Sequence, residues 1–144
     1  MRGIGNDVMK DHLVAWNYYQ TTKTPANEKF VAAYKAKYGA NRVTDDPIEA
    51  GYIAVKLWAL AVEKAQSTEV DKVRAAAGGI SYAAPEGKVT INGKNQHISK
   101  TVRIGKIRAD GLIDEISATP APVEPDPYPE TYPWGAEFVK EKKK

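Results

Sequence analysis

The chain has no cysteine, which excludes a disulfide framework and a thiolate zinc site. It also lacks a long apolar run, because the longest one, residues 53–62, is interrupted by Lys56 and is too short to span a membrane. The first residues, Met1-Arg2-Gly3, show no feature of a secretion signal, so no signal peptide is expected in this chain. What is present is the composition of an ordinary globular domain: 144 residues, 42% of them hydrophobic and 27% charged.

The residues before the C-terminal lysine run carry no net formal charge. The formal charge is +3, and residues 140–144, with four lysines and one glutamate, account for all of it. A protein that binds nucleic acid needs a basic stripe on a folded face, whereas a terminal lysine run is typical of a solvated end. The charge distribution therefore argues against nucleic acid as a partner.

Three helices are predicted in the first half of the chain. The first has Thr24 as its N-cap, carries aromatic residues at four-residue spacing and ends at Gly39. The second starts at Asp46, which is expected to cap it, and has so wide an apolar stripe that only a few residues, Glu49 among them, are expected to face water. A capping box at Thr68 predicts the third helix, which ends at Gly78-Gly79.

Strands are predicted before and after these helices. Residues 13–19 are dense in aromatic and β-favouring side chains and predict a strand buried on both faces. After residue 79, alternating side chains and turn signals predict short antiparallel strands at residues 80–83, 88–91, 98–108 and 112–116. Six of the nine prolines lie between Pro120 and Pro133, which predicts an extended strap. The fold class is therefore α/β: a strand, three helices, antiparallel strands and a proline-rich strap.

This order leaves a β-layer unaccounted for. The early strand has no parallel neighbour in the chain, yet two apolar helices need a sheet to cover. We therefore expect the helices from residue 30 to residue 62 to cover strands that these 144 residues do not contain.

Three sequence blocks carry a family resemblance: AWNYYQTTKTPANEKFVAAYKAKYG (residues 15–39), VTDDPIEAGYIAVKLWALAVEKAQSTEVDKVRAA (43–76) and YAAPEGKVTINGKNQHISKTVRIGKIRADG (82–111). In this order and spacing they resemble the C-terminal part of urea-type substrate-binding proteins of ABC transporters. Those proteins belong to the branched-chain amino-acid and amide binding family, with the type I periplasmic binding protein fold. The KNQHISK and IRADG stretches within the third block and the PDPY segment are also similar to amide-sensing regulators of amidase operons.

The resemblance implies the C-terminal part of a two-lobed fold. It assigns residues 1–79 to a strand and helices that complete the first lobe, and residues 80–118 to strands that cross toward the second. Residues 119–135 form the strap, and residues 136–144 are expected to be a charged, disordered tail. In this family the signal sequence and most ligand contacts precede the part that the chain resembles. We therefore expect the missing N-terminal part of the same protein to be a partner, and the chain alone to bind urea poorly.

The resemblance also implies a function. It points to the solute-binding component of an ABC importer for urea or short-chain amides, which would work with permease subunits in the membrane. The full-length protein would then be periplasmic or at the cell surface. An amide-sensing regulator of an amidase operon, a branched-chain amino-acid binding protein and a self-standing interaction domain are the alternatives. A signal peptide upstream would favour the transporter over the regulator.

The candidate ligand-binding residues are Asp45, Asp46 and Tyr52. In the family, the segment before the second helix faces the cleft between the lobes, where a carboxylate can accept the N–H groups of urea. One carboxylate suffices for the cap, so Asp46 is expected to cap the helix and Asp45 to be available for the ligand. Tyr52 lies one turn further and is expected to be a core residue more than a ligand contact.

No catalytic residue, metal or cofactor is predicted. Adjacent carboxylates such as Asp45 and Asp46 rarely converge on one substrate bond, so an enzyme is not expected. His12 and His97 are far apart and lack metal-ligand spacing, and we expect His97 to hydrogen-bond in a turn beside Asn95.

Overall fold

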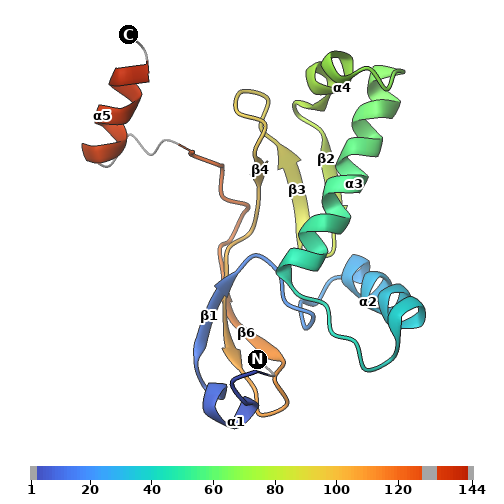
Figure 1. Cartoon of the computed structure of the whole chain (residues 1–144), viewed down its shortest axis with the longest axis vertical. Coiled ribbons are helices and arrows are strands. Elements are labelled where there is room, and N and C mark those ends of the chain that lie inside the picture. Colours follow the sequence, from blue (N-terminus) through green and yellow to red (C-terminus); the bar gives the residue numbers. More distant parts are fainter. Residues whose placement is uncertain (1–2, 128–132, 143–144) are drawn as a thin grey trace.

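The computed structural model describes residues 3–127 and 133–142, which form a mixed α/β structure (Figure 1). Its helices are α1 (Asn6–Met9), α2 (Pro25–Tyr38), α3 (Asp46–Ala65), α4 (Val70–Ala77) and α5 (Pro133–Lys142). Its strands are β1 (Leu13–Trp16), β2 (Ser81–Ala84), β3 (Gly87–Ile91), β4 (Ile98–Ser99), β5 (Arg103–Ile107) and β6 (Ile113–Ala118). The predicted α/β class and the three central helices are thus confirmed.

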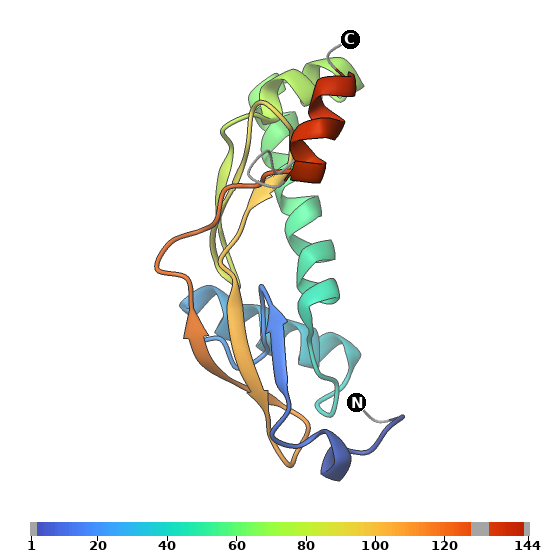
Figure 2. The same ribbon diagram turned by 90° about the vertical axis from the view of Figure 1, so that its left-hand side faces the viewer.

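The strands form two separate antiparallel sheets. One has the order β1-β5-β6 and the other the order β2-β3-β4. The two sheets follow one another along the longest axis of the molecule, and α2, α3 and α4 flank the β2-β3-β4 sheet (Figures 1 and 2). Two connections run between the sheets: the link from β4 to β5 and the segment from β1 to α2 (Figure 1). The junction of the two sheets therefore lies near the middle of the molecule.

The early strand has a partner that the sequence did not predict. β1 pairs antiparallel with β5, with Leu13 opposite Lys106 and Trp16 opposite Arg103. It is shorter than expected and mostly exposed, and the two tyrosines after it, Tyr18 and Tyr19, are the buried ones. The expectation of a strand buried on both faces is therefore wrong, because β1 is an edge strand of a three-stranded sheet. The pairing also crosses the expected boundary at residue 79, and the lobe assignment of residues 1–79 and 80–118 stays a prediction.

Helix α2 begins and ends as its sequence predicts. Thr24 Oγ1 accepts a hydrogen bond from the Asn27 backbone N–H at 3.0 Å, and Gly39 ends the helix at a φ of 113°. The Tyr34 ring lies 6.3 Å from the Phe30 ring and 4.8 Å from the Tyr38 ring, centroid to centroid. The predicted aromatic face is confirmed because residues four apart lie on one side of a helix.

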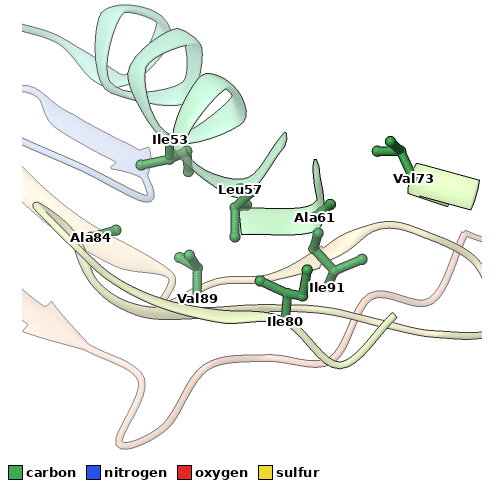
Figure 3. Close-up of a cluster of buried hydrophobic side chains, with 8 residues drawn as sticks. All are labelled: Ile53, Leu57, Ala61, Val73, Ile80, Ala84, Val89 and Ile91. Carbon is green, nitrogen blue, oxygen red and sulfur yellow. The ribbon is translucent and has the colours of Figure 1, made fainter. Parts of the chain in front are cut away.

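The main core lies between α3 and the β2-β3 hairpin. Side chains from α3 point toward side chains from the two strands, and Val73 of α4 adds to one end of the cluster (Figure 3). The cluster consists of Ile53, Leu57, Ala61, Val73, Ile80, Ala84, Val89 and Ile91. The hairpin thus supplies part of the β-layer that α3 was expected to find outside the chain.

The opposite face of α3 is left uncovered by the described residues. Val55 is 64% exposed and Trp58 is 56% exposed. Glu49, expected to face water, is instead fully buried. The periodicity of the sequence identified an apolar helix, but it did not distinguish the face that meets the hairpin from the face that does not.

The C-terminal part departs from expectation. Residues 119–127 of the strap belong to no helix or strand, and Val123 forms an isolated antiparallel bridge with Lys100. Residues 133–135, predicted to be the end of the strap, belong to α5. The predicted disorder of residues 136–144 is wrong as far as Lys142, because Pro133 suits the first turn of α5 and only one glycine interrupts the residues that follow. Tyr128 and Tyr132, whose aromatic side chains predict that part of the strap packs on a surface, lie outside the described residues.

Helix α4 begins without the predicted capping box. Its N-cap residue is Glu69, which forms no side-chain cap, so the capping box predicted at Thr68 is wrong. Among the described residues, no helix combines the length and apolar character needed to cross a bilayer.

Gly105 permits the close packing of the β1-β5-β6 sheet, and its replacement by alanine should be costly. A Cβ at residue 105 would lie 2.9 Å from Tyr19 Cε2 and would also overlap the Ile113 side chain. We expect Gly105→Ala to lower the free energy of unfolding by about 1–3 kcal/mol, the usual cost of overpacking a core. Urea denaturation followed by circular dichroism measures the change.

Gly51→Ala is the matched control. Gly51 lies inside α3 with nothing within 4 Å of an added Cβ. This substitution should raise the free energy of unfolding by about 0.5–1 kcal/mol because alanine is the better helix former. Equal denaturation midpoints for the two variants would contradict the packing described at residue 105.

Candidate functional site at the junction of the sheets

The two adjacent aspartates have different partners, and the cap of α3 is Asp45, not Asp46 as expected. Asp45 is the N-cap of α3, and its Oδ1 accepts the Ile48 backbone N–H at 3.0 Å. Asp46 Oδ1 accepts the backbone N–H groups of Asn17 at 3.1 Å and Tyr18 at 2.9 Å. Asp45 therefore starts the helix, and Asp46 ties the helix to the segment that leaves β1.

A pocket of about 290 Å³ lies beside Asp45, between the loop before α3 and the turn that joins β5 to β6. Its residues come from α1, from the end of β1 and the segment after it, and from these two loops. They are Asn6, Trp16, Tyr19, Gln20, Val43, Thr44, Asp45, Asp110, Gly111, Leu112 and Ile113. The pocket thus collects residues from distant parts of the sequence, from Asn6 to Ile113.

The pocket combines aromatic rings with hydrogen-bond acceptors. The rings of Trp16 and Tyr19 stack with centroids 6.4 Å apart. Asp110 is already engaged, because its Oδ2 accepts from Arg108 at 2.8 Å and its Oδ1 accepts the Leu112 backbone N–H at 3.0 Å. Asp45 uses only Oδ1 among the described residues, so its second oxygen is available to a ligand. Among the residues that the structure describes, no lysine, arginine or histidine lines this pocket.

A buried polar network holds the loop before α3 in place. The Tyr18 hydroxyl donates to Asn27 Oδ1 at 2.7 Å and lies 2.8 Å from Thr44 Oγ1. The Thr44 backbone N–H donates to Gln20 Oε1 at 3.0 Å. These bonds fix the residue immediately before Asp45, so the position of the pocket carboxylate is set by the segment after β1.

Only one of the three predicted ligand residues lines this pocket. Asp45 does, whereas Asp46 is bound to backbone N–H groups and Tyr52 lies elsewhere. The Tyr52 ring packs 4.7 Å from the Phe30 ring, and its hydroxyl lies 3.4 Å from that of Tyr82. This packing agrees with the expectation that Tyr52 is a core residue, and the ligand role of all three residues stays a prediction.

Arg103, the first residue of β5, connects the two sheets. Its Nη2 donates to the Glu86 carbonyl oxygen at 2.6 Å and its Nη1 to the Asn17 carbonyl oxygen at 2.6 Å. Its Nε donates to Glu115 Oε2 at 2.8 Å. The side chain is 8% exposed, and its planar fork of donors reaches the β2-β3 turn, the segment after β1 and β6.

Two buried glutamates lie beside this arginine. Glu49 Oε1 accepts the Glu86 backbone N–H at 3.2 Å, and the Lys100 ammonium lies 3.3 Å from Glu86 Oε1. Burial raises the pKa of the Glu49 carboxyl. Burial, and then the charge of Glu49, raise the pKa of Glu86 from its ordinary value of 4.5 to about 7.

Sequence reasoning missed this junction. Arg103 occupies an inward position of β5, in line with Gly105 and Ile107, and a cation at an inward strand position is a signal that could have been used. The prediction for His97 is confirmed. Its backbone N–H donates to Asn95 Oδ1 at 3.0 Å, in the predicted turn. In the part of the chain that the structure describes, no three histidine, cysteine or carboxylate side chains are grouped as metal ligands.

Comparison with known proteins places this fold. A model of the periplasmic binding protein domain matches residues 1–133. A solute-binding protein of an ABC transporter from Rhodopseudomonas palustris BisB5, solved in complex with 3,4-dihydroxybenzoic acid, is similar, with 24% identity and a TM-score of 0.74. The similarity covers 83% of this chain and 33% of that protein. The leucine-binding protein LivK from Thermotoga maritima has 23% identity and a TM-score of 0.68, over 81% of this chain and 33% of its own.

One similar protein is named as a hydroxylase and not as a binding protein. A protein named limonene hydroxylase from Geobacillus stearothermophilus is 27% identical over 124 residues, which is 86% of this chain and 23% of that protein. The chain thus spans about a quarter of this relative and about a third of the two solved structures. At these identities the likeness to the solved structures shows the fold.

The two roles of Asp45 can be separated by substitution. Asparagine caps a helix about as well as aspartate, whereas alanine costs about 0.5–2 kcal/mol. We expect Asp45→Ala to lower the free energy of unfolding by that amount and Asp45→Asn to leave it nearly unchanged. Urea denaturation of both variants provides the measurement, and equal losses for the two would show that the side chain does not act as a cap.

Proposed function

Because the chain belongs to the periplasmic binding protein domain family, we propose that it forms part of the solute-binding component of an ABC importer. In this function no bond is made or broken. Ligand binding favours one relative arrangement of two lobes, and the permease subunits in the membrane respond to it. Such a protein would work in the periplasm or at the cell surface.

The ligand class that we propose is urea or a short-chain amide. The observation that carries this proposal is the pocket beside Asp45, which presents a carboxylate oxygen and aromatic rings but no cationic side chain. A carboxylate accepts the N–H groups of urea or an amide and repels the carboxylate of an aromatic acid. The pocket of this chain is thus suited to a different ligand from that of its neighbour with 3,4-dihydroxybenzoic acid.

An amino acid is the second candidate. One of the structural neighbours is a leucine-binding protein. Asp45 could pair with the α-ammonium group of such a ligand, although the ligand's carboxylate would then need a cation from outside this pocket. Urea and amides need no such cation, so we place them first.

The rest of the two-lobed fold is the further partner that we propose. Val55 and Trp58 form an apolar face on α3 that no described residue covers. In a two-lobed protein this face would pack against the remaining strands of one lobe, because apolar helices cover sheets. We also propose that α2, α3, α4 and the β2-β3-β4 sheet lie in one lobe and the β1-β5-β6 sheet in the other, which follows the observed pairing.

Calorimetry tests the proposed ligand. Titrations with urea, acetamide, leucine and 4-hydroxybenzoate would be carried out on this chain alone and on this chain together with the remaining two thirds of the fold, in the same polypeptide or as a second one. We expect a dissociation constant for urea or acetamide above about 1 mM for the chain alone, since one side of the ligand stays solvated, and in the micromolar range for the combined protein.

Asp45→Asn in the combined protein tests the role of the carboxylate. It should weaken binding about 10-fold or more, the usual effect of losing a hydrogen bond to a charged group, while the cap is kept. Asp114→Asn is the control, because Asp114 lies on β6 outside the pocket. Tight binding of 4-hydroxybenzoate and none of urea or acetamide would refute the proposed ligand class, and tight binding of leucine would select the second candidate.

A further inference from the structure

Glu49 and Glu86 are fully buried, and neither has a complete set of hydrogen-bond partners. They are 0% and 1% exposed. Glu49 Oε1 accepts the Glu86 backbone N–H, whereas Glu49 Oε2 and both side-chain oxygens of Glu86 take part in no hydrogen bond among the described residues. Buried carboxylate oxygens that accept no hydrogen bond are rare, and the proposed ligand pocket uses neither glutamate.

The positive charge around the pair does not balance it. The Lys100 ammonium faces Glu86 at 3.3 Å. Arg103 lies beside the pair, but its donors bind Glu115 and two backbone carbonyl oxygens, and the charge of Glu115 offsets that of the guanidinium. Asp46 at the start of α3 adds negative charge to the same region. If both glutamates were ionised, a net negative charge would be buried here, which is strongly unfavourable.

The other titratable groups that face the pair do not help. Tyr18 lies on the segment after β1 and Tyr82 on β2, and burial raises the pKa of both phenols. They therefore stay neutral over the pH range in which carboxyl groups titrate. The excess negative charge is therefore neutralised by protonation of the glutamates themselves.

We propose that Glu49 and Glu86 hold one proton between them and that this proton locks the junction between the two sheets. When the pair holds this proton, only one negative charge is buried, and Lys100 is close enough to balance it. Without the proton, repulsion between the two carboxylates displaces the β2-β3 turn, whose Glu86 carbonyl oxygen is bound by Arg103 of the other sheet. Because Glu49 Oε1 binds the Glu86 backbone N–H and the charge of Glu49 acts on the Glu86 carboxyl group, the two groups titrate together and the proton belongs to the pair.

The position of Glu86 explains why its charge affects the junction. Its backbone N–H donates to α3, its carbonyl oxygen accepts from Arg103 of β5, and its side chain faces Lys100 on the link between β4 and β5. The bond from Arg103 joins the β2-β3-β4 sheet to the β1-β5-β6 sheet, and the other two contacts hold the same turn against α3 and against the link between the sheets. A change at Glu86 therefore changes how firmly the sheets are held.

The pH range follows from the direction of the shift. The folded pKa of Glu86, about 7, is raised above the ordinary value of 4.5. A carboxyl group with a raised folded pKa stabilises the fold fully below pH 4.5, and this stabilisation is lost as the pH rises through about 7. The junction should be locked at pH 5 and loosened at pH 8.

The absence of cysteine allows a direct measurement of the junction. Lys72→Cys on α4 and Ser117→Cys on β6 place two spin labels at exposed positions on either side of it. Double electron–electron resonance then gives the distribution of distances between the labels. We expect a narrow distribution at pH 5 that broadens with a midpoint near pH 7.

Neutral variants separate the proton from the shape of the side chain. Glu86→Gln keeps the size of the side chain without its charge, so its distribution should stay narrow at both pH values, and Glu49→Gln should behave in the same way. Glu63→Gln is the matched control, because Glu63 is exposed on the same helix, and it should respond to pH as the native chain does.

Each outcome decides the matter. An unchanged distribution in the native chain between pH 5 and pH 8 overturns the proposal, as does a Glu86→Gln chain that broadens like the native one. Circular dichroism accompanies each sample: a native chain unfolded at pH 8 beside a folded Glu86→Gln chain supports the lock, and unfolding of both contradicts it. No ligand is present, so the result is independent of the proposed transport function.

Discussion

The side chain of Arg103 is the interaction on which the arrangement of the two sheets depends. Each sheet has its own small core, and the junction between them is made of polar contacts. Arg103 reaches three separate segments through bonds of 2.6–2.8 Å. A guanidinium can do this because its donors are fixed in one plane, whereas the single ammonium of a lysine cannot span the same three acceptors. A polar junction also differs from an apolar core in that its strength depends on charge, and therefore on pH.

The helices were predictable from the sequence because their signals are local. A cap, a proline in the first turn and a terminal glycine act within a few residues, and α2 follows all of them. The burial of Glu49 was not predictable in this way, since it depends on a turn 37 residues further along the chain. The pairing of β1 with β5 is another contact between distant segments, and no pattern within either strand specifies its partner.

The candidate site shows the same limit. Sequence reasoning selected the aspartate pair, and Asp45 lines the pocket, but the helix cap was assigned to Asp46 in place of Asp45. A side chain at either position can cap a helix that has a proline in its first turn. The choice is made by Asn17 and Tyr18, whose backbone N–H groups bind Asp46 and leave Asp45 to the helix. Arg103, Glu86 and Glu49 were missed because each has its function only in combination with the others.

The uncovered face of α3 has a consequence for how the chain behaves at high concentration. Val55 and Trp58 lie one turn apart on a rigid helix, so they present a continuous strip of apolar surface to water. Two copies of such a strip attract one another, and the attraction grows with concentration and with temperature near ambient conditions. Self-association of the isolated chain would hide Trp58 from solvent quenchers, which makes this tryptophan an intrinsic reporter of whether the strip is free or occupied.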